Sequence, residues 1–152
     1  MKRFAAILLF LVAAGSFSQV KQLEAGFSPG GTALVLVEKA ISAARSEVLV
    51  ACYEFTSRDV AEALEAAAHR GVKVRIVADW KAAHDRFSQI AVLKAAGMPV
   101  RLDRVYAIMH NKSMVIDGVT IETGSFNYTT VAIKHNAENA LVFWNVPQIA
   151  EV

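Results

Sequence analysis

The chain has 152 residues, a length that suits one domain with a sizeable hydrophobic core. Its 16 basic and 14 acidic residues leave a formal net charge of +2, which excludes the strong overall basic field of many nucleic-acid-binding proteins. The single cysteine, Cys52, excludes an intramolecular disulfide. No cysteine–histidine spacing, paired-carboxylate motif or glycine-rich phosphate loop indicates a metal or cofactor site, so we expect chemistry that uses neither.

The N-terminus has the three parts of a secretory signal peptide. Residues 1–3 are a basic start, residues 4–14 are an unbroken apolar run, and residues 15–18 supply small side chains for cleavage. The apolar run is shorter than the roughly 20 residues that span a bilayer. We predict a signal peptide over residues 1–22, cleaved between Gly15 and Ala25, and a domain over residues 23–152 that is periplasmic or secreted. An uncleaved membrane anchor is the alternative.

Cleavage would change the charge of the protein. Loss of Lys2 and Arg3 lowers the basic count from 16 to 14, equal to the acidic count, and we expect no stable membrane association afterwards. Binding to a polyanion must then come from a local patch. Candidates for that patch are Arg58, Lys73, Arg75, Arg101, Arg104, Lys112 and Lys134, each of which taken alone is a typical solvated surface charge.

Helix and strand patterns alternate along the first part of the chain. Residues 22–31 are rich in turn formers, and Thr32 is positioned to cap a helix that runs to about Ala44. Residues 47–55 and 72–78 read as strands, separated by a helix over residues 58–70 that Ser57 caps and Gly71 ends. Periodic apolar positions support both helices.

The second part of the chain continues this pattern. A loose stretch over residues 79–86 precedes a helix over 87–96, a short strand over 98–102, a β-hairpin with an Asp117–Gly118 turn, a strand over 140–144 and a helix that Pro147 opens. These elements predict an α/β fold in which helices flank a mixed β-sheet. The final helix, if it stops at Val152, would be too short to be stable alone.

One stretch, residues 110–127, carries the candidate chemistry. It reads H-x-K, four residues, D, six residues, G-S-x-N, with its fixed positions at His110, Lys112, Asp117, Gly124, Ser125 and Asn127. At about one in twenty per residue type, chance gives this pattern on the order of 10⁻⁸ per starting point. Each piece alone is ordinary surface or turn sequence, but the combination favours a functional site.

The predicted hairpin explains how these residues meet. His110 and Lys112 precede or begin its first strand on one face, and residues 124–127 follow its second strand, so all lie at one end. Lys112, Ser125 and Asn127 can donate hydrogen bonds to an anion, and Gly124 lets backbone approach a ligand. A histidine beside such donors is typical of a nucleophile or acid–base aimed at a phosphate. Asp117 is interpreted as a structural turn residue.

This motif resembles the signature of the phospholipase D superfamily at every fixed position. The predicted signal peptide, the length, and residues 124–129 and 136–140 make the chain similar to the small bacterial periplasmic endonucleases of that superfamily. The resemblance implies a metal-independent phosphodiesterase that cuts DNA, with RNA as a further candidate substrate. It also implies a phosphohistidine intermediate and two copies of the motif per site.

Because the chain has one motif, the resemblance implies a homodimer with a shared site. One His110 would attack and the other would protonate the leaving group, which predicts a bell-shaped pH profile. Glu138 would orient the histidine, and Ser125 would add a hydrogen bond. The other histidines, His69, His84 and His135, lack a partner motif. Glu54 would disfavour a polyanion if it faced the site.

Two alternatives stay open. A phospholipase acting on a lipid phosphodiester uses the same superfamily chemistry, and an apolar surface beside the site would favour it; Met109, Phe126 and Tyr128 are candidates for that surface. The other alternative is a non-catalytic binding module whose active site has decayed, but the expected residue is present at every motif position.

Overall fold

The computed structural model describes residues 22–150. The predicted signal peptide lies outside this range except for Gln22, which begins the first strand. Within residues 22–150, no helix has both the length and the apolar character needed to cross a membrane.

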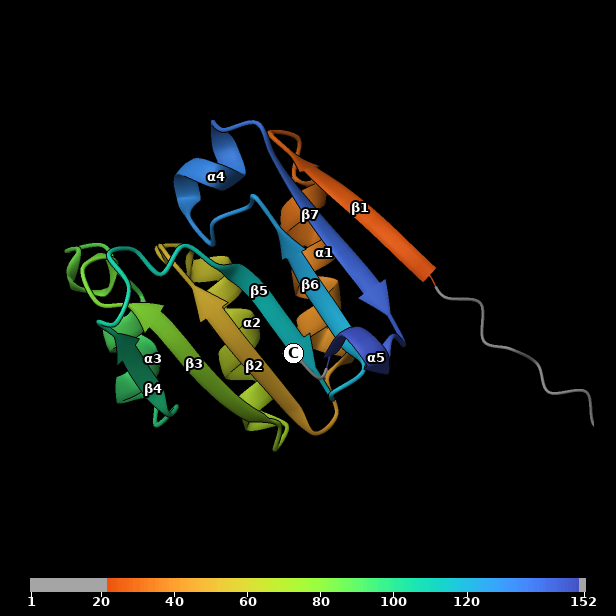
Figure 1. The fold of residues 1–152 in the computed structure, drawn as a ribbon, viewed down its shortest axis with the longest axis horizontal. Coiled ribbons are helices and arrows are strands. Elements are labelled where there is room, and N and C mark those ends of the chain that lie inside the picture. Colours follow the sequence, from red (N-terminus) through yellow and green to blue (C-terminus); the bar gives the residue numbers. More distant parts are fainter. Residues whose placement is uncertain (1–21, 151–152) are drawn as a thin grey trace, which may run out of the picture.

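A seven-stranded mixed sheet forms the centre of the fold, in the order β1-β7-β6-β5-β2-β3-β4 (Figure 1). Its strands are β1 (Gln22–Ser28), β2 (Glu47–Cys52), β3 (Lys73–Asp79), β4 (Val100–Asp103), β5 (Lys112–Ile116), β6 (Thr120–Gly124) and β7 (Glu138–Trp144). Strands β2, β3 and β4 are parallel neighbours, and every other pairing is antiparallel. The predicted α/β class with a mixed sheet is confirmed.

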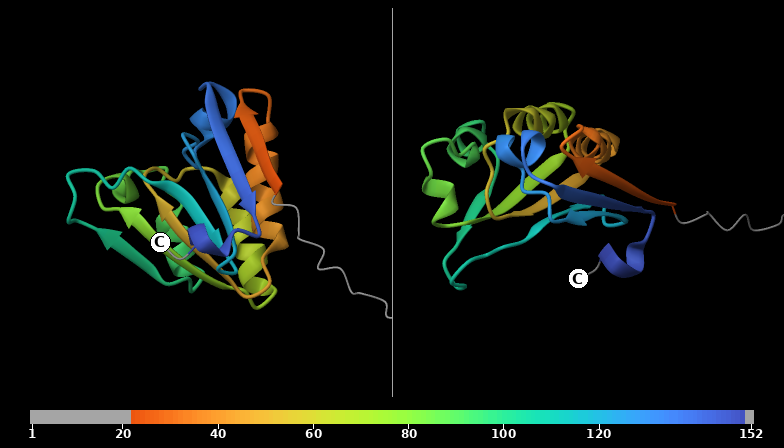
Figure 2. Two further views of the ribbon diagram at one scale, coloured as in Figure 1. Left: turned by 45° about the vertical axis from the view of Figure 1, so that its right-hand side comes forward. Right: turned by 90° about the horizontal axis from the view of Figure 1, so that it is seen from above.

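Three helices cover one face of the sheet, as the view from above shows (Figure 2). They are α1 (Thr32–Ala43), α2 (Arg58–His69) and α3 (Ile90–Ala95), and their apolar sides form one core with alternate residues of the strands. Val48, Val50 and Cys52 of β2 point into this core, whereas Leu49 and Ala51 on the other face are only partly buried. The short α5 (Pro147–Ala150) lies on that opposite side.

The hairpin is confirmed. Strands β5 and β6 pair antiparallel with Ser113 opposite Thr123. Asp117 and Gly118 both have positive φ, 52° and 65°, as the tight turn preferred between twisted antiparallel strands requires. Ser57 caps α2 as predicted, because its side chain accepts a hydrogen bond from the backbone N–H of Val60.

The prediction for residues 22–31 was wrong, because most of this segment is the edge strand β1, paired along its length with β7. Its large apolar residues Leu23 and Phe27 are more than half exposed, whereas its buried positions are Gly26 and Ser28, so no apolar alternation in the sequence reveals the strand. Gly26 lets the start of α1 lie against it, since a Cβ there would be 2.5 Å from the carbonyl oxygen of Thr32. Thr32 does not cap α1; its hydroxyl bonds the backbone of Phe27.

Two short helices also differ from expectation. The helix predicted over residues 87–96 begins only at Ile90, because the Asp85 carboxylate holds the N–H of Phe87 in a turn and the N–H of Gln89 donates to Phe55. A 3₁₀ turn, η1 (Ala82–His84), lies in the stretch before it. Helix α4 (Thr130–Lys134), which Thr129 caps, was not predicted.

Candidate active site

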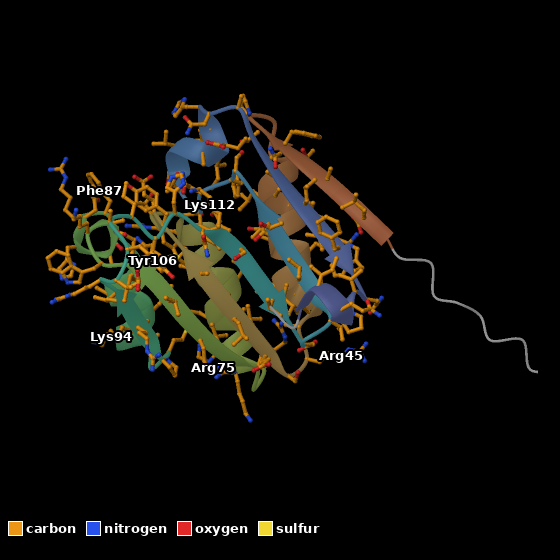
Figure 3. The ribbon with its side chains drawn as sticks, in the orientation of Figure 1. Arg45, Arg75, Phe87, Lys94, Tyr106 and Lys112 are labelled. Carbon is orange, nitrogen blue, oxygen red and sulfur yellow. The ribbon has the colours of Figure 1, made fainter. Side chains whose placement is uncertain are left out.

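The motif residues gather where β2 ends, β5 begins and β6 ends. Because β5 runs antiparallel to β2, Lys112 pairs with Cys52, the last residue of β2. Strand β6 ends at Gly124 and β7 begins at Glu138, so both ends lie at the same edge. This edge is at the upper end of the sheet in Figure 1, and Figure 3 labels Lys112 there. The strand topology therefore brings the start of β5 and the end of β6 to the same end of the sheet, as the hairpin predicted.

Lys112 is 7% exposed and holds its ammonium beside His110. Its Nζ donates to the backbone carbonyl of His110 at 2.8 Å and lies 5.3 Å from the centroid of the Tyr53 ring. Burial lowers the pKa of Lys112, although the carboxylates of Glu138 and Glu54 favour its charged form. The two remaining ammonium hydrogens are available to an anionic ligand.

His110 is exposed at the rim of the site. Its ring lies against Tyr53, with centroids 4.7 Å apart and the planes tilted by 52°. Within residues 22–150, neither ring nitrogen makes a hydrogen bond. Glu138, which the resemblance implies as the partner that orients the histidine, instead accepts a hydrogen bond from Asn136 at 3.0 Å. In this single chain, therefore, the His110 ring contacts Tyr53 and makes no hydrogen bond with Glu138.

The Gly-Ser-x-Asn segment is fixed to β7. The N–H groups of Ser125 and Phe126 both donate to the Asn139 carbonyl at 3.1 Å, and the Ser125 hydroxyl accepts from the Asn139 N–H. A Cβ on Gly124 would be 2.2 Å from the Asn139 carbonyl oxygen. Glycine is thus needed at this position because β7 lies so close. The sequence had suggested instead that Gly124 lets the backbone approach a ligand.

Asn127 contributes an unused polar group. Its side-chain Oδ1 is buried and has no hydrogen-bond partner in the part of the chain that the structure describes. Buried side-chain oxygens are rarely left unpaired. This oxygen can only accept a hydrogen bond, so the Nδ2 group of the same amide is the part of Asn127 that can donate to an anionic substrate.

Asp117 lies at the opposite end of the hairpin from His110. Its carboxylate accepts hydrogen bonds from the backbone N–H groups of Arg45, Ser46 and Glu47 and from the Ser46 hydroxyl, at 2.7–3.0 Å. Partial burial alone would raise its pKa, but these bonds outweigh burial and lower the pKa to about 2. The carboxylate ties the hairpin turn to the start of β2.

Two residues of the site were missed from sequence. Tyr53 follows β2 and contacts both His110 and Lys112. Asp79 ends β3, is 3% exposed, and accepts hydrogen bonds from the N–H groups of Ala82 and Met109. Asp79 therefore fixes the segment that leads into His110. Both lie at the carboxyl ends of parallel strands, where ligand-binding side chains often occur, and that position was the available signal.

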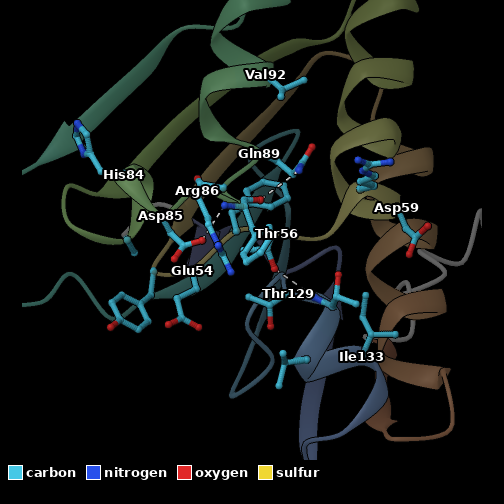
Figure 4. Close-up of a pocket in the computed structure, with 18 of the residues that line it drawn as sticks. Glu54, Thr56, Asp59, His84, Asp85, Arg86, Gln89, Val92, Thr129 and Ile133 are labelled. Carbon is cyan, nitrogen blue, oxygen red and sulfur yellow. Dashed lines mark hydrogen bonds between the residues drawn. The ribbon is translucent and has the colours of Figure 1, made fainter.

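A groove of about 1150 Å³ adjoins the site and begins at Tyr53 and Glu54. Figure 4 shows its walls: Asp85, Arg86 and Gln89 on one side, and Thr129 and Ile133 on the other. Arg58, Lys81, Arg86 and Lys134 bring positive charge to the groove, whereas Glu54, Asp59 and Asp85 bring negative charge. Of the predicted patch, only Arg58 and Lys134 line this groove.

The remaining histidines do not join the motif. His69 ends α2, His135 follows α4, and His84 lines the groove with Nδ1 2.6 Å from the Trp80 carbonyl oxygen. Among residues 22–150, no cluster of three histidine, cysteine, aspartate or glutamate side chains could hold a metal ion. The chemical groups at the site are one imidazole, one ammonium, one hydroxyl and one amide, a set suited to binding and attacking a phosphate.

Comparison with known proteins gives a consistent family. The family model described as "Cardiolipin synthase, PLD-like domain" matches residues 37–152. The structure superposes on Nuc from Salmonella typhimurium, a phospholipase D family member, with a TM-score of 0.84 and 43% identity over 86% of this chain and 88% of that one. For NucT from Helicobacter pylori the TM-score is 0.78, with 29% identity over 86% and 89% of the chains.

Curated relatives include human mitochondrial cardiolipin hydrolase and a Rickettsia felis phospholipase D. The human protein is 37% identical over 117 residues, which are 77% of this chain and 46% of the relative. The Rickettsia protein is 35% identical over 116 residues, which are 76% of this chain and 58% of the relative. The chain thus spans about half the length of these relatives.

Proposed function

This chain belongs to the phospholipase D superfamily of phosphodiesterases, and we propose that it is an endonuclease that hydrolyses DNA without a metal ion. The observation that carries the proposal is the convergence of His110 and Lys112, at the start of β5, with the Ser125–Asn127 segment, which follows the end of β6. RNA is a further candidate substrate, because phosphate contacts carry no sequence information.

In the proposed reaction, the His110 imidazole attacks phosphorus and the P–O bond to the leaving oxygen breaks, which gives a phosphohistidine. A second imidazole donates the proton to that oxygen, and water then cleaves the phosphohistidine. Lys112 and Asn127 hold the nonbridging oxygens, since Lys112 carries free ammonium hydrogens and the Nδ2 group of Asn127 is a hydrogen-bond donor. Glu138 supports the charge of Lys112, and Ser125 shapes the segment.

We propose a homodimer as the active form. One chain supplies one motif histidine, and that His110 is exposed at the rim of the site. A two-fold axis beside His110 would bring the second imidazole from a second copy. We also propose export to the periplasm or beyond the cell, on the strength of the N-terminal sequence alone.

Digestion of plasmid DNA in excess EDTA tests the nuclease proposal. Wild type should nick and linearise the plasmid, His110→Ala should be inactive, and His69→Ala, a change on α2 away from the motif, should behave as wild type. Cleavage by His110→Ala, or cleavage that chelation abolishes, would contradict the proposal.

A phospholipase is the second candidate, and one observation favours it. The segment before His110 exposes Val105 by 83%, Tyr106 by 67% and Ile108 by 53%, and such a patch beside basic residues suits a membrane surface. Hydrolysis of cardiolipin or phosphatidylcholine vesicles by wild type, weakened by Tyr106→Ser, would support it. Equal activity of Tyr106→Ser and wild type on vesicles would remove the support.

A further inference from the structure

A carboxyl group lies in the hydrophobic core close to the candidate site. Glu122 on β6 and Tyr128, which follows the Gly-Ser-x-Asn segment, are both 0% exposed. The Tyr128 hydroxyl donates to Glu122 Oε2 at 2.6 Å, whereas Glu122 Oε1 is buried without a partner among residues 22–150. Fully buried glutamates are rare, so this one needs an explanation beyond packing.

The pair joins the two ends of the catalytic segment. Glu122 precedes Gly124 by two residues, and Tyr128 directly follows Asn127, so their hydrogen bond closes a loop around Ser125 and Asn127. The Tyr128 carbonyl also accepts hydrogen bonds from the N–H groups of Thr56 and Ser57 at 2.9 Å. The pair thereby connects the segment to the loop after β2, which carries Tyr53.

The surroundings of Glu122 hold its proton. Burial raises its pKa to about 8, although the Tyr128 hydroxyl acts in the opposite direction. Met114 and Val142 flank it in the sheet, and the side chains that α1 and α2 bury toward the sheet are all apolar. Burial therefore favours the protonated, neutral form of this carboxyl.

Few other ionisable groups face this carboxyl. Burial raises the pKa of the Cys52 thiol to about 12, and burial with the nearby Glu122 raises that of Tyr128 well above its ordinary value, so both stay neutral. Lys112 lies diagonally across from Glu122 in the strand register, but its ammonium is turned toward the His110 carbonyl and the Tyr53 ring. Among these groups, Glu122 alone gains or loses a proton near pH 8.

We propose that Glu122 is a positioning residue: its protonated carboxyl, bonded to Tyr128, holds the segment with Ser125 and Asn127 in its reactive shape, and loss of the proton releases that segment. The ionised carboxylate would keep one hydrogen-bond donor, the Tyr128 hydroxyl. A buried carboxylate needs several donors, and water can supply them only if the segment opens. The catalytic consequence rests on the proposed phosphodiesterase function; the structural one does not.

The first test measures kcat and KM on bis(p-nitrophenyl) phosphate from about pH 6 to about pH 10, across the ionisation of Glu122. Glu122→Gln keeps the acceptor for Tyr128 but cannot ionise. Its kcat should stay within about threefold of wild type at pH 7, whereas above pH 8 wild-type kcat should fall by about tenfold per pH unit relative to the variant. Identical pH profiles for the two proteins would overturn the proposal.

The second test needs no substrate, so it separates this proposal from the proposed function. Hydrogen exchange of the backbone amides of residues 124–128 is compared between wild type and Glu122→Gln at each pH, which cancels intrinsic exchange. Protection in wild type should match the variant at pH 7 and fall below it at pH 9, above the Glu122 pKa. Equal protection at both pH values would overturn the proposal. Tyr128→Phe should lower protection already at pH 7.

Discussion

The ammonium of Lys112 donates to the backbone carbonyl of His110 at 2.8 Å, so two motif residues are locked together before any substrate binds. His110 lies two residues before β5 and Lys112 begins that strand, with its ammonium 5.3 Å from the centroid of the Tyr53 ring. Preorganised donors of this kind stabilise a developing negative charge without rearrangement.

Lys112→Met should therefore retain the fold and lose catalysis. Removal of one such donor typically lowers kcat by about 10²- to 10³-fold. Methionine keeps the apolar stem, so the melting temperature should change little. Lys112→Arg is the matched control for charge: its larger planar head cannot occupy the same 7% exposed position, so it should rescue only part of kcat. Full activity of Lys112→Met would exclude a role at the phosphate.

Gly124→Ala should disrupt the site. Its Cβ would meet backbone, the Asn139 carbonyl oxygen at 2.2 Å, and the segment would have to move away from β7. Gly26→Ala is the matched control, because its Cβ would also meet backbone, the Thr32 carbonyl oxygen at 2.5 Å, but on β1, on the other side of β7 from Gly124. Both variants should lose about 1–3 kcal/mol of stability. Only Gly124→Ala should lose kcat when assayed where both remain folded.

Asp117 makes a pH-dependent contribution to stability. Its pKa is depressed to about 2 in the folded chain, so the contribution is present above the unfolded value near 3.8 and disappears as the pH falls through about 2. Asp117→Asn tolerates the positive φ but loses the charge. It should lower the free energy of unfolding by about 1–2 kcal/mol at pH 7 and by much less near pH 2, measured by urea denaturation. A constant difference across pH would contradict this assignment.

If DNA binds in the groove, lysines that line it should contribute to DNA binding and lysines elsewhere should not. Lys134 and Lys94 both lie in the last turn of a short helix, but only Lys134 lines the groove. Lys134→Glu should weaken binding of His110→Ala protein to DNA and reduce the salt dependence by about one counterion, and Lys94→Glu should not. Binding is measured by fluorescence anisotropy over a salt series. Equal effects of the two changes would show that DNA does not bind in this groove.

The sequence predicted the parts of the fold that local chemistry determines. An Asp-Gly pair readily adopts the positive φ angles of a tight hairpin turn, and Ser57 caps a helix, so the hairpin and α2 were predicted correctly. Strand β1 was missed because its order comes from pairing with β7, which no local pattern encodes. Helix α4 has five residues, too few for a periodic signal.

The same distinction holds for the candidate site: the motif predicted some of its residues, and only the tertiary fold brings in the others. Motif spacing brought His110, Lys112, Ser125 and Asn127 together, because a hairpin fixes their distances. Tyr53 and Asp79 come from strands β2 and β3, and only the tertiary fold carries them to His110. The bond of Glu138 to Asn136 depends on the turn before β7, which the motif does not include.

The central claim is that His110 is the nucleophile, and trapping the covalent intermediate tests it most directly. Wild type is mixed with a short DNA substrate, denatured within the first turnovers under alkaline conditions, and mapped by mass spectrometry. The account predicts a DNA fragment joined through its terminal phosphoryl group to His110 and to no other residue, and none in His110→Ala. An adduct on His84 or His135, or turnover by His110→Ala at the wild-type rate, would contradict it.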